Sequence, residues 1–302
     1  MVYDVHEYYA RYYSEKLPLP DKWQRVVQRF LDWYQVRVVR KIGGANVVAE
    51  PMAPPYRRRG VPVSVSANLP MRAPYDAQPV TSFLARRHRA VHIGTLSESY
   101  GMHLLVNMAA EAHRRGLNVT FDLVEKFPNK VQEARFHELL ASAGNPPNVR
   151  LVPVIPAHKI ASFLSSYGIG LSTILSGGQN DIAIPTKLYE YALMGLVVVG
   201  TDRVAQRRFL NKWGVADLFA DSDVVGMVDA IATQTVEAGD VTLRIQATAA
   251  RAREQLFWEV GPANQLSELL SQVSAPPDGK GESVSSPSSA VRTAPSSVGS
   301  RG

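Results

Sequence analysis

A lysine and a glutamate stand three residues apart at the start of a predicted helix, in the stretch "AIPTKLYEYALMGLVVVG" (183–200). Pro185 suits the first position of that helix, because its fixed φ fits there and its missing N–H is not needed. The free N–H groups of a first turn, together with the helix dipole, favour an anion. Lys187 lies in that turn, where a cation destabilises the helix unless an anion is present. Lys187 and Glu190 therefore predict an anion-binding site, although an i, i+3 salt bridge on a solvated helix explains the same spacing.

The surrounding chain predicts a sheet that presents this helix at a ligand-binding edge. From 90 to 252, short apolar runs alternate with amphipathic ones, as in a parallel, doubly wound sheet. The predicted strands are 90–96, 118–124, 148–155, 168–174, 196–202 and 216–220, and the predicted helices are 101–115, 130–143, 157–167, 185–194, 204–213 and 222–233. Ligands of such sheets bind beyond the C-terminal ends of the strands, where the loop 175–184 and the following helix should lie. We therefore expect an α/β fold with one complete Rossmann-like domain.

Composition and periodicity divide the chain into four segments. We expect a partial N-terminal Rossmann-like domain, a complete Rossmann-like domain, closing helices and a tail, over 1–78, 79–252, 253–273 and 274–302. The first boundary falls in a Pro-rich stretch, 69–79. The closing helices should pack back on the N-terminal domain, with a break near Gly261. The tail is rich in Ser, Pro and Gly and has no aromatic residue, so we expect it to be disordered.

The charge and composition of the chain limit the classes of partner that it can bind. The 302 residues carry a net charge of +6, which favours nucleotides, phosphates, a membrane surface or nucleic acid, with a soluble protein that has a basic face as the alternative. With no cysteine and no pair of histidines at metal-ligand spacing, no metal is expected. No apolar run is long enough to span a membrane and the N-terminus does not resemble a signal peptide, so the expected location is the cytoplasm. The basic loop 54–60 is too short a signal to predict nucleic-acid binding.

The helix predicted over 21–42 combines apolar and basic side chains. Its apolar residues share one side: Trp23, Val26, Val27, Phe30, Tyr34 and Val38. Its basic residues are Arg25, Arg29, Arg37, Arg40 and Lys41. Interleaved aromatic and basic residues can form a face that contacts a membrane surface. A solvated outer face is the alternative.

Several stretches together resemble the GT-B glycosyltransferases, in particular glycosyltransferase family 4. "PTKLYEYALMG" (185–195), followed by "LVVVGTD", resembles the nucleotide-sugar site of that family. "VHIGTL…GMHLLVNMAAEAHRRG" resembles the first strand and helix of its C-terminal domain, and "NVRLVPVIPAHKIASFLSSYGIGLSTI" resembles the middle. "VYDVHE" is similar to a strand of the N-terminal domain that ends in a histidine, and "NLP" to the segment before the interdomain linker. The likeness covers about residues 1–272.

This resemblance implies roles for residues on both sides of a cleft. Glu190 would hold the ribose hydroxyls of a UDP- or GDP-sugar, since a carboxylate accepts two such hydrogen bonds. Lys187, with the N–H groups of Thr186 and Lys187, would face the diphosphate. His6 would lie near the donor sugar and act as the catalytic residue, by donating to a sugar hydroxyl or to the leaving phosphate. On its own, His6 is better explained as a histidine on an N-terminal surface, and it is Asp4 and Glu7 around it, in the family's pattern, that favour the catalytic role.

The resemblance also assigns two loops to the donor. Asn180 and Asp181 would approach the sugar hydroxyls, with turn formation and helix capping as the alternative. Gly94 and Thr95 would lie beside the nucleotide sugar. Many family members have an arginine in place of Thr95 and a lysine in place of Tyr100, both facing the diphosphate. Losing one such contact costs about 1.5–3 kcal/mol.

Two further differences from the family concern the charge and the commoner motif. Lys187, together with Lys126, would have to supply the positive charge for the diphosphate. Ile182 stands where the commoner E-x7-E motif has a glutamate, so the chain has the P-x-K-x-x-E variant.

The expected reaction is sugar transfer from a UDP- or GDP-sugar to an acceptor hydroxyl with retention, and without a metal or other cofactor. The acceptor would be a glycan, a lipid or a small molecule, and peripheral contact with a membrane at its inner face would suit a lipid. In the family, several strands precede the one that begins this chain. A truncated gene reading, or a non-catalytic remnant that binds a nucleotide sugar or a partner, would explain this start. A GT-B sugar-nucleotide epimerase is the remaining alternative.

Overall fold

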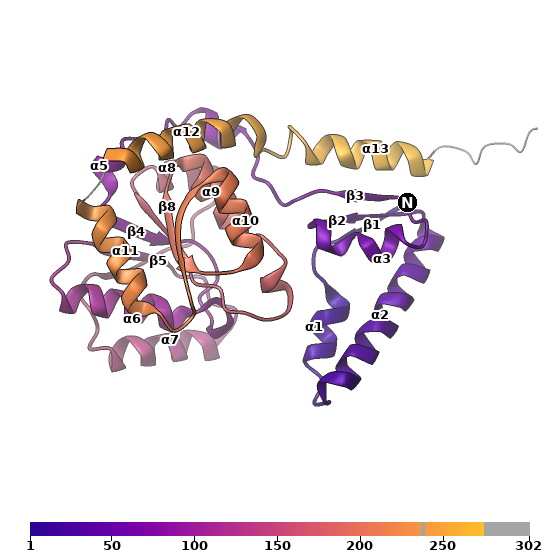
Figure 1. Ribbon diagram of the computed structural model, residues 1–302, viewed down its shortest axis with the longest axis horizontal. Helices are drawn as coiled ribbons and strands as arrows, with labels where there is room; N and C mark the ends of the chain where they lie inside the picture. Colours follow the sequence, from indigo (N-terminus) through magenta and orange to yellow (C-terminus); the bar gives the residue numbers. More distant parts are fainter. Residues whose placement is uncertain (237–238, 275–302) are drawn as a thin grey trace, which may run out of the picture.

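The computed structural model of the chain describes residues 1–236 and 239–274 and has two lobes, each built on a parallel sheet (Figure 1). The tail predicted over 274–302 lies outside the described residues, apart from Ser274, which ends the last helix. The α/β class expected from the sequence is confirmed.

The larger lobe is a six-stranded sheet with the strand order β6-β5-β4-β7-β8-β9. The strands are β4 (Arg89–His92), β5 (Thr120–Val124), β6 (Val149–Val152), β7 (Ile169–Ser172), β8 (Val197–Thr201) and β9 (Val215–Phe219). Strands β5 and β6 follow β4 on one side of it in the sheet, and β7 then pairs with β4 on its other side. The strand order therefore reverses between β4 and β7, and sheets of this kind have their ligand-binding crevice at the carboxyl ends of these two strands.

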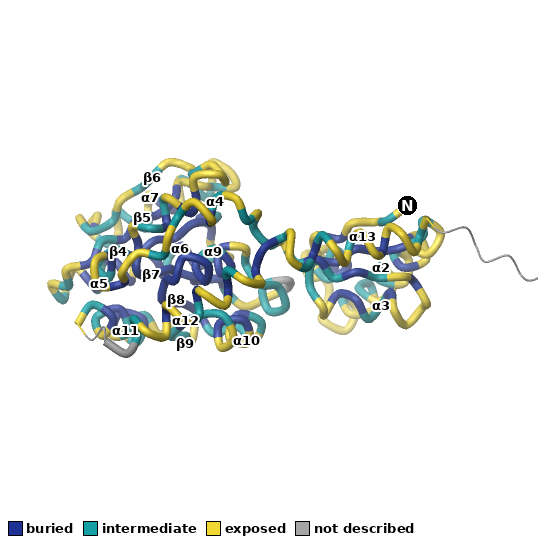
Figure 2. Tube along the Cα trace, turned by 90° about the horizontal axis from the view of Figure 1, so that it is seen from above, coloured by how far each residue is buried: buried dark blue, intermediate teal, exposed yellow. Residues whose placement is uncertain are grey.

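Helices cover both faces of this sheet (Figure 1). They are α6 (Met102–Arg114), α7 (Lys130–Ser142), α8 (Ile160–Leu164), α9 (Thr186–Met194), α10 (Val204–Trp213), α11 (Val224–Val236) and α12 (Gly239–Gln255). One buried cluster joins α6, α7 and α11 to one face, and another joins α8, α9, α10 and α12 to the opposite face. Because both faces are covered, the four central strands β4, β5, β7 and β8 are almost entirely buried, and they run through the interior of the lobe in Figure 2.

Several predicted elements are shorter in the structure, for local reasons. The strand predicted over 90–96 ends at His92, because Gly94 has a φ of +145° and leaves the extended conformation. The strand predicted over 148–155 ends at Val152, since Pro153 has no N–H to give to the sheet. The helix predicted over 157–167 is a 3-10 turn (Ala157–Lys159) followed by the short α8.

The smaller lobe has a three-stranded parallel sheet in the order β1-β2-β3. Its elements are β1 (Val2–Val5), α1 (Tyr9–Glu15), α2 (Asp21–Ile42), β2 (Gly44–Val47), a 3-10 turn (Glu50–Met52), α3 (Pro54–Arg57) and β3 (Val63–Val65). The buried Val36 and Val39 of α2 pack with Val5 and Val47. The last helix, α13 (Pro262–Ser274), packs on the sheet and contacts all three strands.

Two segments of chain run side by side between the lobes (Figure 1). One leads from β3 to α4 (Ala73–Asp76) and α5 (Phe83–Arg86), and the other leads from α12 back to α13. The Trp258 N–H donates to the Pro70 carbonyl at 3.0 Å, and the Arg72 N–H donates to the Glu259 carboxylate at 3.1 Å. Tyr75 of α4 is buried in the core of the larger lobe.

Candidate functional site: the carboxyl ends of β4 and β7

The helix that carries Lys187 and Glu190 is fixed at the crevice by a tyrosine. The Tyr191 hydroxyl accepts from the Ile93 N–H at 3.2 Å and donates to the Val91 carbonyl at 3.2 Å, which joins α9 to the end of β4. Gly170 of β7 leaves room for the tyrosine ring, because a Cβ there would lie 2.5 Å from it. At the other end of α9, Gly195 adopts the left-handed conformation, and the buried Arg86 donates to its carbonyl at 2.9 Å.

Lys187 is a buried side chain, only 4% exposed, although it lies in the first turn of α9. Pro185 precedes the helix as its N-cap and Thr186 is the first helical residue, so the helix begins one residue later than predicted. Lys187 Nζ lies 3.4 Å from Nδ1 of His92, the last residue of β4. Among the described residues it forms no ion pair within 4.0 Å. The solvated i, i+3 salt bridge considered for Lys187 and Glu190 is therefore absent.

Gly94 borders the space in front of these two side chains. A Cβ placed on Gly94 would lie 3.6 Å from His92 Nε2 and 3.8 Å from Lys187 Nζ. His92 Nε2 is buried and has no hydrogen-bond partner among the described residues. A cationic nitrogen, an unsatisfied ring nitrogen and a residue without a side chain thus meet at the switch point of the sheet. A buried polar atom without a partner is costly, and a bound ligand that forms a hydrogen bond with it would remove that cost.

Glu190 lies one turn along α9 on the same side. Its carboxylate is partly buried and, among residues 1–236 and 239–274, receives no hydrogen bond. Burial raises the pKa of Glu190 to about 7, although Lys126 and Lys187 oppose the shift. Because no described residue donates to it, the ionised carboxylate has both oxygens available to accept hydrogen bonds from a ligand.

The same desolvation acts on the two basic groups. Burial lowers the pKa of Lys187 to about 7, and the nearby Glu190 opposes this shift. Burial and the Lys187 charge hold the pKa of His92 well below its usual value, so the ring is neutral. His92 Nδ1 lies 3.2 Å from the Leu171 carbonyl and 3.4 Å from Lys187 Nζ. The Leu171 carbonyl can only accept, so this shorter contact places the ring proton on Nδ1 and leaves Nε2 as an acceptor beside Gly94.

His6 lies at the carboxyl end of the other sheet, where side chains of three strands form a ladder. Ser64 Oγ donates to Asn46 Oδ1 at 2.7 Å, and Asn46 Nδ2 donates to Asp4 Oδ1 at 2.9 Å. Asp4, Asn46 and Ser64 are register partners in β1, β2 and β3, so their side chains lie on one face. Asp4 Oδ2 in turn lies 2.7 Å from His6 Nε2. The ladder therefore fixes the carboxylate that orients the imidazole.

Two interactions place the end of β1 opposite the larger lobe. The pKa of Tyr100, in the loop between β4 and α6, is raised by burial and by the charge of Glu7. Arg11 Nη2 of α1 lies 3.5 Å from Asp181 Oδ2. His6, between Asp4 and Glu7, thus belongs to the face that meets the carboxyl edge of the larger sheet.

Asn180 and Asp181 have partners within their own loop. Asn180 Nδ2 donates to the Leu175 carbonyl at 3.0 Å, and Asp181 Oδ1 accepts from Ser176 Oγ at 3.0 Å. These bonds fit the turn-forming alternative for both residues. Asp181 adds the bridge to Arg11, so it joins the lobes.

The remaining predicted residues surround this edge. Thr186 is exposed at the start of α9, and Thr95 is partly exposed next to Gly94. Lys126, just beyond β5, is exposed, and its charge acts on Glu190. In the described part of the chain, no group of three or more His, Asp or Glu side chains is placed to hold a metal ion. No helix within that part is long and apolar enough to cross a membrane.

His92 is the one member of this site that sequence reasoning missed. It stands inside the apolar run "AVHIGTL", where it counts as a core residue of a buried strand. A histidine at the carboxyl end of a strand next to the switch point was the available signal. Its role became visible only when α9 placed Lys187 against it.

Solved structures similar to this chain include an O-GlcNAc transferase and a protein described as a glycosyltransferase from Rickettsia africae. HepE of Anabaena, solved in complex with UDP and glucose, matches with a TM-score of 0.65 and 15% identity, over 89% of this chain and 71% of HepE. S. aureus TarM matches with a TM-score of 0.60 and 17% identity, over 81% of this chain and 46% of TarM. The pneumococcal O-GlcNAc transferase GtfA, in complex with UDP and GlcNAc, matches with a TM-score of 0.59 and 13% identity, over 80% of this chain and 47% of GtfA.

This chain has the GT-B fold. The GT-B fold expected from the sequence is therefore confirmed, with one complete Rossmann-like lobe and a smaller lobe of three strands. The chain spans less than half the length of TarM and GtfA. No family model matches the sequence, and no curated protein matches it.

Proposed function

We propose that this chain binds a nucleotide diphosphate sugar at the crevice between β4 and β7 and transfers the sugar to an acceptor hydroxyl. The observation that carries the proposal is the buried Lys187 beside the unsatisfied His92 Nε2 and the open Gly94. A diphosphate there would accept hydrogen bonds from the Lys187 ammonium and from the first N–H groups of α9, and His92 Nε2 would accept one from a hydroxyl of the ligand. The HepE, TarM and GtfA structures each contain UDP, which supports a uridine nucleotide as the first ligand to test.

Glu190 suits the ribose end of such a ligand. It is one turn from Lys187 and its carboxylate has no hydrogen bond to any described residue. Two ribose hydroxyls would donate to its two oxygens, and a bond to a charged acceptor is about twice as strong as a neutral one. Lys126 would lie beside this end of the donor and could balance the charge of Glu190.

The proposed reaction follows family 4 and retains the configuration of the transferred sugar. The acceptor hydroxyl would attack on the face from which the diphosphate leaves, so catalysis would rest on positioning and on stabilising the leaving charge. His6, oriented by Asp4, would donate to a sugar hydroxyl or to the leaving phosphate from the smaller lobe. Lys187 and the α9 N–H groups would supply the positive potential, without a metal.

A second candidate is a protein that binds the nucleotide sugar without transferring it. Thr95 and Tyr100 favour it, because neither side chain can bring a positive charge to the diphosphate. Both candidates predict nucleotide binding, and sugar transfer or slow hydrolysis of the donor separates them.

The test of the proposal is nucleotide binding measured by calorimetry with UDP and with GDP. Lys187→Ala and Glu190→Ala should each weaken binding about tenfold, which corresponds to about 1.4 kcal/mol. Lys187→Met keeps the volume of the buried stem and should behave like Lys187→Ala. Lys130→Ala removes an exposed lysine of α7 and should bind like the wild type. Absence of binding at millimolar nucleotide would remove the main support for the proposal.

A further inference from the structure

Two isoleucines of the loop 175–184 pack on different lobes. Ile182 is partly buried against the core of the smaller lobe, which residues between Val5 and Val61 form. Ile184 is partly buried against the core of the larger lobe, to which the loop itself belongs. Among the described residues, Ile182 is the one residue of the larger lobe that packs on the smaller core. The loop therefore contacts both lobes through apolar side chains.

An ion pair lies next to this apolar contact. Asp181 Oδ2 lies 3.5 Å from Arg11 Nη2 of α1, and α1 contacts the 3-10 turn that ends at Asp181 (Gly178–Asp181). The Arg11 side chain is 29% exposed, and a partly exposed pair at this distance contributes little by itself. Burial of the Ile182 side chain is therefore the larger part of the contact. We call Arg11, Asp181 and Ile182 together the interlobe contact.

Hydrogen bonds within the loop hold the shape that presents Ile182 to the smaller lobe. Asp181 Oδ1 accepts from Ser176 Oγ at 3.0 Å and from the Gly177 N–H at 3.3 Å. One oxygen of Asp181 thus closes the loop, while the other oxygen faces α1. The carboxylate therefore has a structural partner on each lobe.

The start of the loop is fixed to the neighbouring strand. The Ile174 carbonyl accepts from the hydroxyl of Thr201, the last residue of β8, at 2.6 Å and from Arg203 Nε at 3.1 Å. Arg203 also forms an ion pair with Asp221, which follows β9. Because its start is held in this way, the loop belongs rigidly to the larger lobe. Contact with α1 therefore fixes the two lobes relative to each other.

The interlobe contact is a second attachment between the lobes. The two connecting segments join the lobes near the top of Figure 1, and α1 lies below them, between α2 and the larger lobe. Two domains with a small interface are free to move relative to each other. A contact away from the connecting segments opposes rotation of the smaller lobe about them.

This attachment is close to the proposed catalytic side chain. Arg11 follows His6 by five residues and lies in α1, which begins at Tyr9. On the other side of the crevice, the Tyr191 hydroxyl holds α9, and with it Lys187, through the end of β4. Movement of the smaller lobe would therefore displace His6 and leave Lys187 in place.

We propose that Ile182 and Arg11 are positioning residues, which dock α1 on the loop 175–184 without a ligand and so hold His6 opposite Lys187. The docking itself is independent of any reaction, and its consequence for catalysis rests on the proposed function. The position of Ile182 fits this role. The glutamate of the commoner motif would lose hydration against the apolar core of the smaller lobe, at a cost in free energy.

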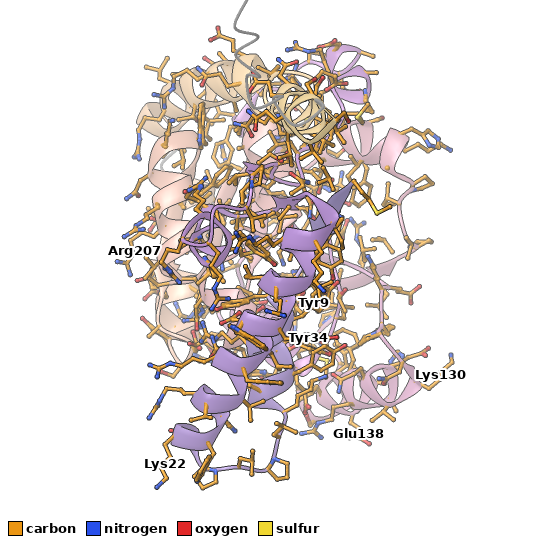
Figure 3. All side chains as sticks on the ribbon, turned by 90° about the vertical axis from the view of Figure 1, so that its right-hand side faces the viewer. Tyr9, Lys22, Tyr34, Lys130, Glu138 and Arg207 are labelled. Carbon is orange, nitrogen blue, oxygen red and sulfur yellow. The ribbon has the colours of Figure 1, made fainter. Side chains whose placement is uncertain are left out.

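The test is the distance between one label on each lobe, measured by pulsed electron paramagnetic resonance. The chain has no cysteine, so Lys22→Cys and Lys130→Cys place nitroxide labels at exposed positions of α2 and α7 (Figure 3). Without a ligand, we expect one narrow distribution of distances. Ile182→Ser should make this distribution at least about twice as wide, because the connecting segments alone then restrain the lobes. Arg11→Gln should widen it less.

Ile184→Ser is the matched control for the distance measurement. It changes an isoleucine of the same loop that packs on the larger lobe, so the distribution should stay narrow. Circular dichroism checks that every variant is folded. A wide distribution in the labelled parent chain would overturn the proposal. It is also overturned if Ile182→Ser leaves the width unchanged, or if Ile184→Ser widens the distribution as much.

Nucleotide binding and turnover separate a positioning role from a general loss of structure. UDP should bind Ile182→Ser as tightly as the wild type in calorimetry, because α9 keeps Lys187 in place. Hydrolysis of UDP-glucose should be at least about tenfold slower, since His6 is no longer held in position. Unchanged hydrolysis in Ile182→Ser would contradict the positioning role. If the wild type neither binds UDP nor hydrolyses UDP-glucose, the proposed function fails, and the distance measurement still decides the docking.

Discussion

Lys187, His92 and Glu190 share one physical condition. Each is desolvated by burial at the carboxyl ends of β4 and β7. Lys187 and Glu190 are pushed toward neutrality from opposite sides, and each has a pKa of about 7. Neither has a strong partner among the described residues, so the cost of burying them is not offset within the chain. A diphosphate for Lys187 and a pair of hydroxyls for Glu190 would offset it. The residues therefore indicate a site prepared for a ligand rather than a structural ion pair.

This condition predicts that binding of the donor takes up a proton above pH 7 and releases a proton below pH 7. A bound diphosphate favours the Lys187 ammonium, so at pH 8, where the free lysine is mostly neutral, binding should take up close to one proton. Ribose hydroxyls favour the Glu190 carboxylate, so at pH 6, where the free glutamate is mostly protonated, binding should release one. Affinity should therefore be highest near pH 7 and fall on both sides, by about tenfold per pH unit at the limit of one proton.

The measurement is calorimetry of a UDP- or GDP-sugar in buffers of different ionisation enthalpy. A nucleotide sugar is used because its diphosphate does not titrate in this range. Lys187→Met should abolish the uptake at pH 8 and keep the release at pH 6. Heats that are independent of the buffer at both pH values would contradict the assigned roles of the two residues.

At the scale of elements, close approach between β7 and α6 shapes the edge of the sheet. Gly101 caps α6 with a φ of +68°, and a Cβ there would lie 2.0 Å from the Thr173 carbonyl oxygen just beyond β7. The Thr173 hydroxyl donates to the Tyr100 carbonyl at 2.9 Å, which joins the two loops. The loop that carries Thr95 and Tyr100 can therefore reach the crevice only if residue 101 has no side chain.

Gly101→Ala should destabilise the fold by more than the strain of its left-handed conformation, which is about 1–2 kcal/mol. Gly116 is the matched control, since it has the same φ of +68° and no atom within 4 Å of its Cβ position. The difference in the free energy of unfolding between Gly101→Ala and Gly116→Ala, measured in urea, isolates the clash. Equal losses in the two variants would show that the contact with Thr173 is not required.

At the scale of the whole molecule, the C-terminal helix stabilises the N-terminal sheet. Helix α13 contacts all three strands of the smaller lobe, and its Leu269 is 3% exposed. Glycines in the sheet permit this contact: a Cβ on Gly44 would lie 3.1 Å from Leu269 and 3.0 Å from Val273. The smaller lobe is thus completed by residues from both ends of the described chain.

Leu269→Ala should lower the stability of the smaller lobe by about 2–5 kcal/mol, the usual cost of a buried leucine. Hydrogen exchange of the β2 amides should accelerate, while amides of β5 and β8 in the larger lobe should keep their protection. The neighbouring Leu270 is 46% exposed, so Leu270→Ala should leave exchange nearly unchanged. Equal acceleration in both lobes would mean that the chain unfolds as a single unit.

The sequence by itself determined the α/β class, the series of strands and helices from 90 to 252, and the pairing of Lys187 with Glu190 on one helix. These follow from local periodicity and from glycine and proline positions, which act over a few residues. His92 could not be assigned that way, because in an apolar strand it is indistinguishable from a core residue. The buried state of Lys187 was equally hidden.

Only the tertiary structure decided what faces what. Strand order placed β4 beside β7, and this brought His92 under Lys187 although 95 residues separate them. The packing of the smaller lobe turned Val36 and Val39 inward and left the aromatic and basic side of α2 exposed. Periodicity distinguishes the two sides of a helix. Which side is buried depends on elements that are distant in the sequence and pack against it. The proposed site therefore depends on contacts between residues that are far apart in the sequence.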